Sequence, residues 1–193
     1  MVRRLIIAAA LALSAPALAA TWQIDPAHSN VSFSVRHMMV SNVRGEFTKV
    51  SGTVEGDEKT PTQAVINATI DATSINTREA KRDDHLKSAD FLDVAKYPTI
   101  TFKSKRIEPS GTGQFKVTGD LTLHGVTKEV VLDVSDVTAP IKDPMGKTRA
   151  GAQATTKIDR KDFGINWSKT MDGGGLLVGN DVDIRIDVEA TTQ

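Results

Sequence analysis

The stretch DVDIRIDVE at residues 181–189 alternates charged and apolar side chains at every position. Its apolar members are Val182, Ile184, Ile186 and Val188. Because successive side chains of an extended strand point to opposite faces, this period of two places all four on one face. One apolar face and one charged face are typical of a strand in an antiparallel sheet with a core on one side. The stretch therefore predicts a half-buried β-strand.

The same alternation recurs along the chain, separated by turns rich in glycine and proline. We find it in eight segments: 30–37, 45–56, 63–73, 99–107, 113–123, 127–138, 149–160 and 179–191. The pair His124-Gly125 predicts a tight hairpin turn with an exposed histidine. This turn would place Leu123 opposite Val126. An open sheet of eight strands leaves unpaired edges, whereas a closed barrel has none, so we expect an all-β, eight-stranded antiparallel barrel.

One segment lacks the strand pattern. Residues 77–96, TREAKRDDHLKSADFLDVAK, are charged, rich in helix-forming residues and free of alternation. Thr77 and Ser88 are plausible helix N-caps, and Pro98 stops the helical stretch before the next strand. We therefore expect a short helical insertion around residues 77–96. The chain shows neither an internal repeat nor a linker, which favours one domain over residues 20–193.

The first 19 residues have the features of a signal peptide. Arg3 and Arg4 precede a short apolar stretch, and Ala17-Leu18-Ala19 matches an A-x-A cleavage site. The apolar stretch is too short to span a bilayer, although an uncleaved anchor is the alternative. We expect residues 1–19 to be removed and the mature protein to be periplasmic, beginning near Ala20.

Composition and motifs narrow the function. The 193 residues include 24 basic and 24 acidic side chains and no cysteine. This balance argues against a nucleic-acid-binding protein, which needs a basic surface. The four histidines show neither H-x-H nor H-x-x-x-H spacing, so we expect neither a metal site nor a cofactor. Since the G-x-S-x-G nucleophile motif is also missing from the sequence, we expect a binding protein rather than an enzyme.

Small side chains raise the question of what fills the barrel. An eight-stranded barrel is either filled by its own side chains or wide enough for one small ligand. Alanines recur on one side of the alternation in segments 149–160 and 63–73; they are Ala150, Ala152, Ala154, Ala68 and Ala72. If they point inward, an apolar tunnel remains. The alternative is that large neighbours such as Phe102 and Phe115 fill the space.

Histidines and arginines are the candidate contacts for a polar ligand head. His37 is in phase with Phe33 and Val35, which predicts that it faces inward near one end of the barrel. His85 either orients the helical segment or contacts the head group. Four arginines could bind a phosphate or quinone oxygen or else form salt bridges; they are Arg36, Arg44, Arg149 and Arg160. Arg160 lies near Asp162, which favours a structural ion pair.

An apolar rim is predicted beside these groups. Phe163 and Trp167, followed by Gly173 to Gly175, are typical either of a mobile loop over an apolar opening or of an ordinary loop closed by packed aromatics. Met38 is a candidate for adaptable contact with an apolar chain, and core packing is its alternative role.

Four long stretches resemble the YceI-like family. They are WQIDPAHSNVSFSVRHMMVSNVRGEF (22–47), RDDHLKSADFLDVAKYPTITFKS (82–104), GDLTLHGVTKEVVLDV (119–134) and IDRKDFGINW (158–167). Leu92 stands where a phenylalanine is expected. The resemblance covers the chain after its leader and implies a lipocalin-like antiparallel barrel. It also implies a periplasmic protein that holds a long isoprenoid, such as a polyprenyl lipid or a quinone tail, in that barrel.

Together these observations predict a protein that binds, sequesters or transports an isoprenoid. The candidate ligand-binding residues are Phe33, Val35, Arg36, His37, Met38, Ile70, His85, Phe102, Phe115, Leu121, Ala152, Ala154, Phe163, Trp167 and Ile184. Alternatives are a fatty-acid or acyl-amide ligand, and an enzyme that uses Arg36, His37 and His85 on the lipid or quinone head. A third is a partner of a membrane redox protein, which would have a filled barrel and an exposed apolar patch. A monomer and a homodimer both remain open.

Overall fold

The computed structural model describes residues 20–172 and 174–192; the predicted signal peptide lies outside this range. The strands are β1 (Ala20–Ile24), β2 (Asn30–His37), β3 (Ser41–Phe47), β4 (Val50–Gly56), β5 (Val65–Asp71), β6 (Ile75–Asn76), β7 (Thr99–Gly111), β8 (Gln114–Leu123), β9 (Val126–Ser135), β10 (Ile141–Lys142), β11 (Thr148–Asp159) and β12 (Val178–Thr192). The helices are the α-helix α1 (Ala80–Lys87) and the 3₁₀ helices η1 (Pro61–Gln63), η2 (Ala72–Ser74) and η3 (Arg160–Phe163). Within the described range, none of these helices combines the length and apolar character needed to cross a membrane.

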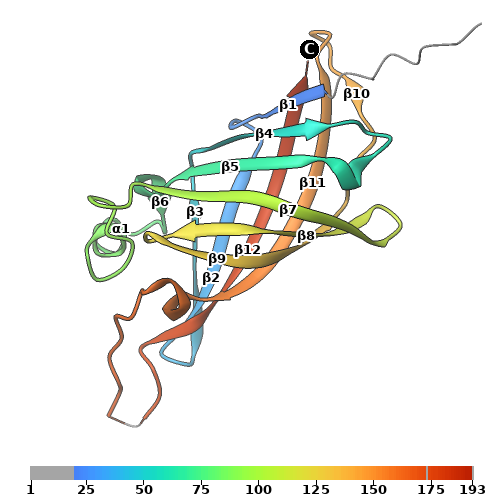
Figure 1. Cartoon of the computed structure of the whole chain (residues 1–193). Coiled ribbons are helices and arrows are strands. Elements are labelled where there is room, and N and C mark those ends of the chain that lie inside the picture. Colours follow the sequence, from blue (N-terminus) through green and yellow to red (C-terminus); the bar gives the residue numbers. More distant parts are fainter. Residues whose placement is uncertain (1–19, 173, 193) are drawn as a thin grey trace, which may run out of the picture.

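Eight strands close into a barrel. They pair in the order β11, β9, β8, β7, β5, β4, β1 and β12, and β12 pairs back onto β11. Every pairing is antiparallel. In Figure 1, β5, β7 and β8 cross in front of the steeper β2, β11 and β12, so that two walls enclose the interior. The predicted all-β, eight-stranded antiparallel barrel is therefore confirmed.

The wall contains two interrupted strands that the alternation did not resolve. β1 pairs with β12 at Gln23 and Ile24, and β2 continues along β12 from Asn30. The expected segment 45–56 is two strands, because β3 pairs with β2 whereas β4 pairs with β1 and β5. The prediction missed β1 because five residues carry little periodicity, and it merged β3 with β4 because the break between them spans only Thr48 and Lys49.

The β8–β9 hairpin has the predicted register, with Leu123 opposite Val126 and Gly119 opposite Val130. Its two turn residues have φ angles of 52° and 73°, the left-handed region that a two-residue hairpin turn uses. The expectation that His124 is exposed is wrong. Its ring is half-buried against Tyr97, with ring centroids 4.9 Å apart, and its Nδ1 lies 3.1 Å from a backbone oxygen of η3.

The helical insertion is present but shorter than expected. Glu79 rather than Thr77 caps α1, because the Thr77 hydroxyl donates to the Asp83 carboxylate instead. Ser88 ends the helix rather than starting a second one, since its backbone N–H bonds the carbonyl of His85. The turns that follow bury Phe91, which joins the apolar core. This segment lies at one end of the barrel, which we call the α1 end (Figure 1).

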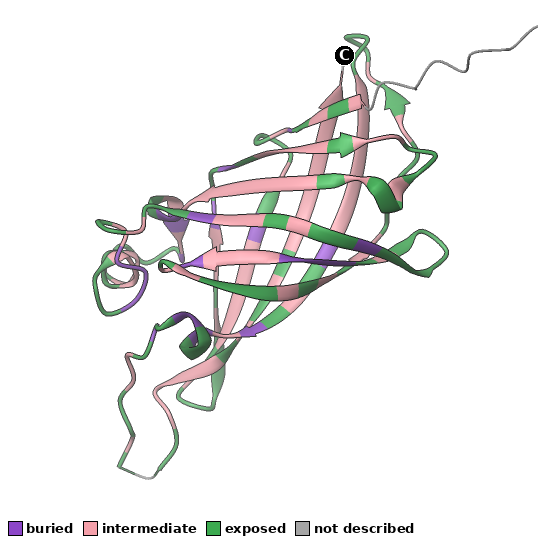
Figure 2. Cartoon of the chain, in the orientation of Figure 1, coloured by how far each residue is buried: buried purple, intermediate pink, exposed green. Residues whose placement is uncertain are grey.

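Many inward-facing apolar side chains of the long strands are only partly buried. The inward residues Val182, Ile184, Ile186 and Val188 are only half-buried. Figure 2 shows the same intermediate burial along most of the long strands, with buried residues near the α1 end and also on parts of β7 and β8. Inward side chains that keep exposed surface face a space that protein atoms do not fill. The fold therefore surrounds a cavity.

Candidate functional site

The barrel encloses a cavity of about 660 Å³. This volume lies within the range of pockets that hold small ligands. Its wall is built from the inward faces of the strands and is overwhelmingly apolar, although its lining residues include some polar ones, such as His37, Arg82 and Thr156. The alternation of the strands creates this surface directly, because every second side chain points into the interior.

Most of the predicted site residues meet at this cavity. Those that line it are Phe33, Val35, Arg36, His37, Ile70, His85, Phe102, Phe115, Leu121, Ala152, Ala154, Trp167 and Ile184. Two do not. Met38 lies in the β2–β3 turn with 42% of its surface exposed, and Phe163 is 2% exposed in the core beneath η3. The period of two correctly predicted which strand residues face the interior. It does not apply to Met38 in a turn or to Phe163 in a 3₁₀ helix. Whether the lining residues bind a ligand stays a prediction.

The structure resolves the question that the alanines raised. Ala68, Ala152 and Ala154 line the cavity, the latter two beside Val188 and Ile186 of β12. Ala72, the first residue of η2, instead packs in the apolar core of the protein and is 1% exposed. The small side chains on β5 and β11 thus leave space inside the barrel, and the larger neighbours do not fill it.

The α1 end contributes lining residues that sequence analysis missed. These are Arg82, Leu86, Phe91, Leu92, Ile165, Leu177 and Val178. The rings of His85, Phe91 and Trp167 form a cluster there, with centroids 5.0 to 5.1 Å apart. This cluster joins the helical insertion to the loop after η3, two segments whose period differs from that of the strands. In the sequence, His85 and Trp167 could be singled out by residue type alone, whereas no pattern indicated Phe91.

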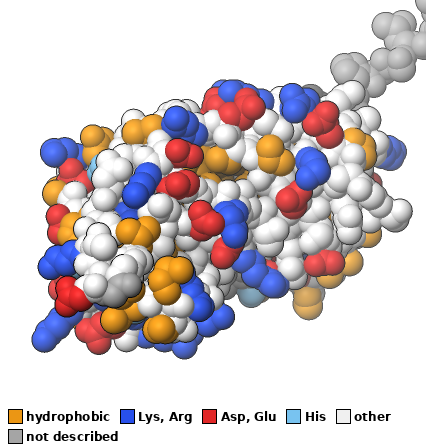
Figure 3. All heavy atoms as spheres, turned by 90° about the horizontal axis from the view of Figure 1, so that it is seen from below, with side chains coloured by type: hydrophobic (Ala, Val, Ile, Leu, Met, Phe, Trp, Pro, Cys, Tyr) orange, Lys and Arg blue, Asp and Glu red, His pale blue; other side chains and the backbone are white. Residues whose placement is uncertain are grey.

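Exposed apolar side chains border the same end. Met39 and Val40, in the β2–β3 turn, are 57% and 75% exposed. The backbone N–H of Met38 donates to the carbonyl of Leu177 at 2.9 Å, which ties this turn to the loop before β12. Figure 3 views the molecule from below Figure 1 and shows hydrophobic side chains grouped among charged ones on this face.

Arg160 is the most unusual polar residue of the cavity wall. It is 4% exposed, and its guanidinium donates to three backbone carbonyls: Ile165 at 2.7 Å, Gly179 at 2.9 Å and Val178 at 3.3 Å. Within the described residues no carboxylate oxygen lies within 4.0 Å of it, so the predicted pair with Asp162 does not form. Burial lowers the pKa of Arg160, and the charge of Asp159 partly opposes that effect.

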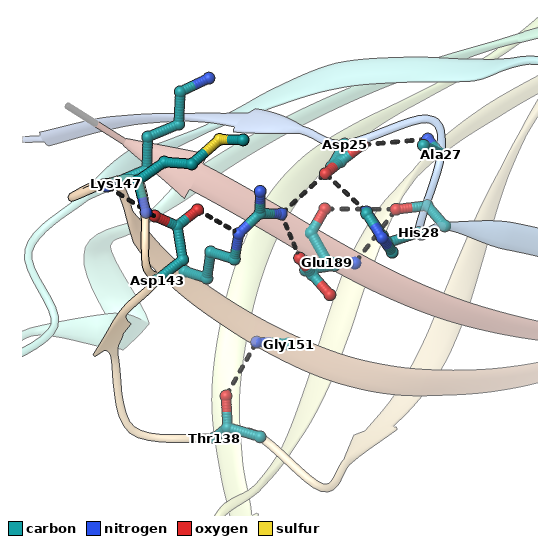
Figure 4. Close-up of polar contacts among 11 residues, drawn as sticks. Asp25, Ala27, His28, Thr138, Asp143, Lys147, Gly151 and Glu189 are labelled. Atoms are coloured by element: carbon teal, nitrogen blue, oxygen red, sulfur yellow. Dashed lines mark hydrogen bonds and ion pairs between the residues drawn. The ribbon is translucent and has the colours of Figure 1, made fainter.

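Arg149, at the other end of β11, has the opposite environment. Its guanidinium contacts the carboxylates of Asp25 and Asp143, each at 2.8 Å, and that of Glu189 at 2.5 Å (Figure 4). We call these residues, with His28, the Arg149 cluster. Hydrogen bonds from His28 and Arg149 hold the pKa of Asp25 far below its usual range. The three carboxylates that accept hydrogen bonds from Arg149 in turn raise its pKa above the usual range.

The Arg149 cluster also brings Asp25, His28 and Glu189 close enough to share a metal ion. Arg149 already supplies the positive charge between the two carboxylates. These contacts tie the β1–β2 turn to the β10–β11 hairpin and to β12. The cluster is thus accounted for as a structural link.

Comparisons with known proteins agree with this architecture. Protein YceI of Escherichia coli O157:H7 is 42% identical over 179 residues, covering 92% of this chain and 90% of its own. The crystal structure of Burkholderia cenocepacia BcnA has a TM-score of 0.75 at 26% identity and covers 86% of this chain and 98% of its own. A polyisoprenoid binding domain from Saccharophagus degradans has a TM-score of 0.66 at 17% identity, with coverages of 89% and 98%. The model of the YceI-like domain matches residues 22–190, and the chain therefore belongs to the YceI-like family.

Proposed function

We propose that this protein binds a long apolar chain, specifically an isoprenoid such as a polyprenyl lipid or a quinone tail, inside the barrel. The observation that carries the proposal is the apolar cavity of about 660 Å³ in a closed barrel. Water in such a space finds few hydrogen-bond partners, so an apolar ligand is the favoured occupant. The Saccharophagus degradans neighbour, described as a polyisoprenoid binding domain, supports the choice of an isoprenoid.

The energetics are adequate if the cavity exists before binding. Burying about 500 Å² of ligand surface at roughly 25 cal/mol/Å² contributes on the order of 12 kcal/mol. Association costs about 4–15 kcal/mol, so the affinity depends on how little must be reorganised. The alanines of β11 and β5 keep space open without a ligand, which favours tight binding.

Polar groups near the cavity support binding rather than catalysis. The hydroxyl of Ser29 donates to the backbone carbonyl of Glu189, while His28 contacts Asp25. A serine nucleophile with a histidine base is therefore not formed at this position. Arg36 is held by the carbonyl of Met39 and by a neighbouring amide. The redox-partner hypothesis required a filled barrel, and the observed cavity favours a ligand instead.

Export belongs to the same proposal. Its support is the leader at residues 1–19 and the sequence Ala17-Leu18-Ala19. Sequencing the N-terminus of protein from the periplasmic fraction should give a start at or near Ala20. Recovery of the chain with Met1 intact from the membrane fraction would contradict export with cleavage.

Native mass spectrometry of the purified protein, followed by lipid extraction, tests the binding proposal. The wild-type protein should carry an extractable prenyl lipid. Ala152→Phe, on the cavity wall, should fold but lose at least about nine-tenths of it, because the larger ring occupies the space of the chain. Thr155→Phe, on the exposed side of β11, is the matched control and should retain the lipid.

Two results would count against this proposal. One is a wild-type protein that carries no lipid and does not bind an added prenyl alcohol. The other is equal retention of lipid by Ala152→Phe and the control. Recovery of an acyl chain in place of a prenyl chain would keep the cavity as the binding site but would reject the isoprenoid.

A further inference from the structure

The positively charged side chain of Arg160, directly after the end of β11, lies on the cavity wall. β11 pairs with β9 only over Gln153 to Thr155, and η3 begins where the two strands have separated. η3 packs against both strands and against β12. Arg160 is its first residue, and the guanidinium reaches the carbonyls of Val178 and Gly179 at the start of β12. This position is on the cavity wall at the α1 end.

The hydrogen bonds of Arg160 leave part of its guanidinium unused. A guanidinium has five N–H groups: one on Nε and two on each terminal nitrogen. Each of the three nitrogens donates to one carbonyl. One N–H on each terminal nitrogen is then without an acceptor among the described residues. Phosphate and carboxylate groups bind guanidinium through two such donors at once.

The guanidinium of Arg160 also has no carboxylate within ion-pair distance among the described residues. Backbone carbonyls accept hydrogen bonds but carry no net charge, and a buried cation without a charged partner is destabilising. The acidic residue next to it in sequence, Asp159, acts on it only through its charge, because the Asp159 carboxylate accepts the backbone N–H of Lys161 at 2.8 Å. The burial of Arg160 in a cavity wall, with free donors, is thus the arrangement that an incoming anion would complete.

Further polar atoms lie on the segments that hold this guanidinium. The side-chain oxygens of Ser168 and Asn180 are buried without a hydrogen-bond partner. Ser168 follows the cavity residue Trp167, and Asn180 follows Gly179. His37, which also lines the cavity, lies opposite Val178 in the β2–β12 pairing. Polar atoms other than those of Arg160 are therefore available at this end.

We propose that Arg160 is the head-group site of the cavity, and that the preferred ligands are long apolar chains ending in an anionic oxygen group such as a phosphate. This inference rests on the proposed function, because the apolar chain must occupy the barrel. The head lies against η3 at the α1 end, and the chain runs toward Ala152 and Phe115. From Arg160 to Ala152 the path along β11 is about 26 Å at roughly 3.3 Å per residue.

The test compares two probes with the same chain, geranylgeranyl phosphate and geranylgeraniol, on delipidated full-length protein. Wild-type protein should bind the phosphate at least about tenfold more tightly than the alcohol. Arg160→Gln should remove this preference while changing alcohol affinity less than about twofold, and Arg160→Lys should restore part of it. Arg44→Gln removes an exposed charge from the outer side of β3 and should behave as wild type.

The two probes separate the two proposals. If neither probe binds wild-type protein, the cavity is not the lipid site and the proposed function fails. If both bind wild-type protein equally well, the lipid site stands and the role of Arg160 is rejected. Equal losses for both probes in Arg160→Gln would also reject it, since they would mark a structural role. If that variant does not fold by circular dichroism, the wild-type preference and Arg160→Lys still decide the matter.

Discussion

Two arginines at opposite ends of β11 show how the same side chain serves different purposes. Arg149, near the start of the strand, contacts three carboxylates. Arg160, just past its end, is more deeply buried and contacts only backbone carbonyls. The first environment overcompensates one positive charge, whereas in the second no carboxylate of the described residues contacts the guanidinium. Ion pairs within the chain thus hold the Arg149 end together, whereas the α1 end contains a buried cation that no carboxylate contacts among the described residues.

The largest expected effect is on stability, at the Arg149 end. Arg149→Met leaves three carboxylates close together without a cation, so the thermal unfolding temperature should fall by several degrees. Arg185→Met is the matched control. Among the described residues, the exposed guanidinium of this β12 arginine bonds Asp187 and Gln153 alone, so its replacement should change the temperature little. Similar melting of both variants would mean that the Arg149 cluster contributes no more than a surface pair.

The second effect is on how the stability of the fold depends on pH. Asp25 has a pKa far below its ordinary value of 3.8 in the folded state, first through His28 and then through Arg149. Asp143 is shifted the same way, chiefly by Arg149. A lowered folded-state pKa stabilises the protein fully above the ordinary value, and this stability is lost as the pH falls below it. Urea unfolding should therefore show constant stability from these groups above about pH 5 and a decline below about pH 4.

Arg149→Met also tests which contact shifts these groups. The variant should show a shallower decline in stability below about pH 4, because its carboxylates lose part of the shift. An unchanged pH profile in Arg149→Met would assign the stabilisation to other groups, such as His28 for Asp25.

The third effect is on ligand binding at the α1 end. His37→Ala should weaken the binding of a prenyl phosphate or prenyl quinone by about 1–3 kcal/mol, the loss expected when a buried polar partner is removed. A plain hydrocarbon tail of equal length should bind nearly unchanged. Titration of both ligands against both proteins measures the difference. Equal losses would mean that His37 only shapes the barrel wall, and no loss would leave the head group to Arg160 alone.

The barrel and most of its lining could be predicted because both follow from local alternation. A period of two identifies which side of a strand is apolar, and the short His124-Gly125 turn determines the register of β8 and β9. The motifs of the YceI-like family led to the same fold, and the family model confirms that resemblance. Thirteen of the fifteen predicted site residues accordingly line one cavity.

The two ends of the barrel could not be predicted in this way. The Arg149 cluster joins residues that are distant in sequence, such as Asp25 and Glu189, and they meet only after closure. The environment of Arg160 depends on η3, whose four residues have no detectable period. Sequence proximity to Asp162 suggested an ion pair there, but the backbone turn directs the guanidinium to carbonyls instead.

The pairing of β12 has a consequence for how the chain folds. This last strand pairs with β11 on one side and with both β1 and β2 on the other, joining Gln23 to Thr191 across nearly the whole described chain. Contacts so distant in sequence are associated with slow folding. During synthesis the earlier strands can form hairpins, but the barrel cannot close until β12 is available. A nascent chain that lacks this strand cannot form the pairings of β12 with β11, β1 and β2 that close the barrel.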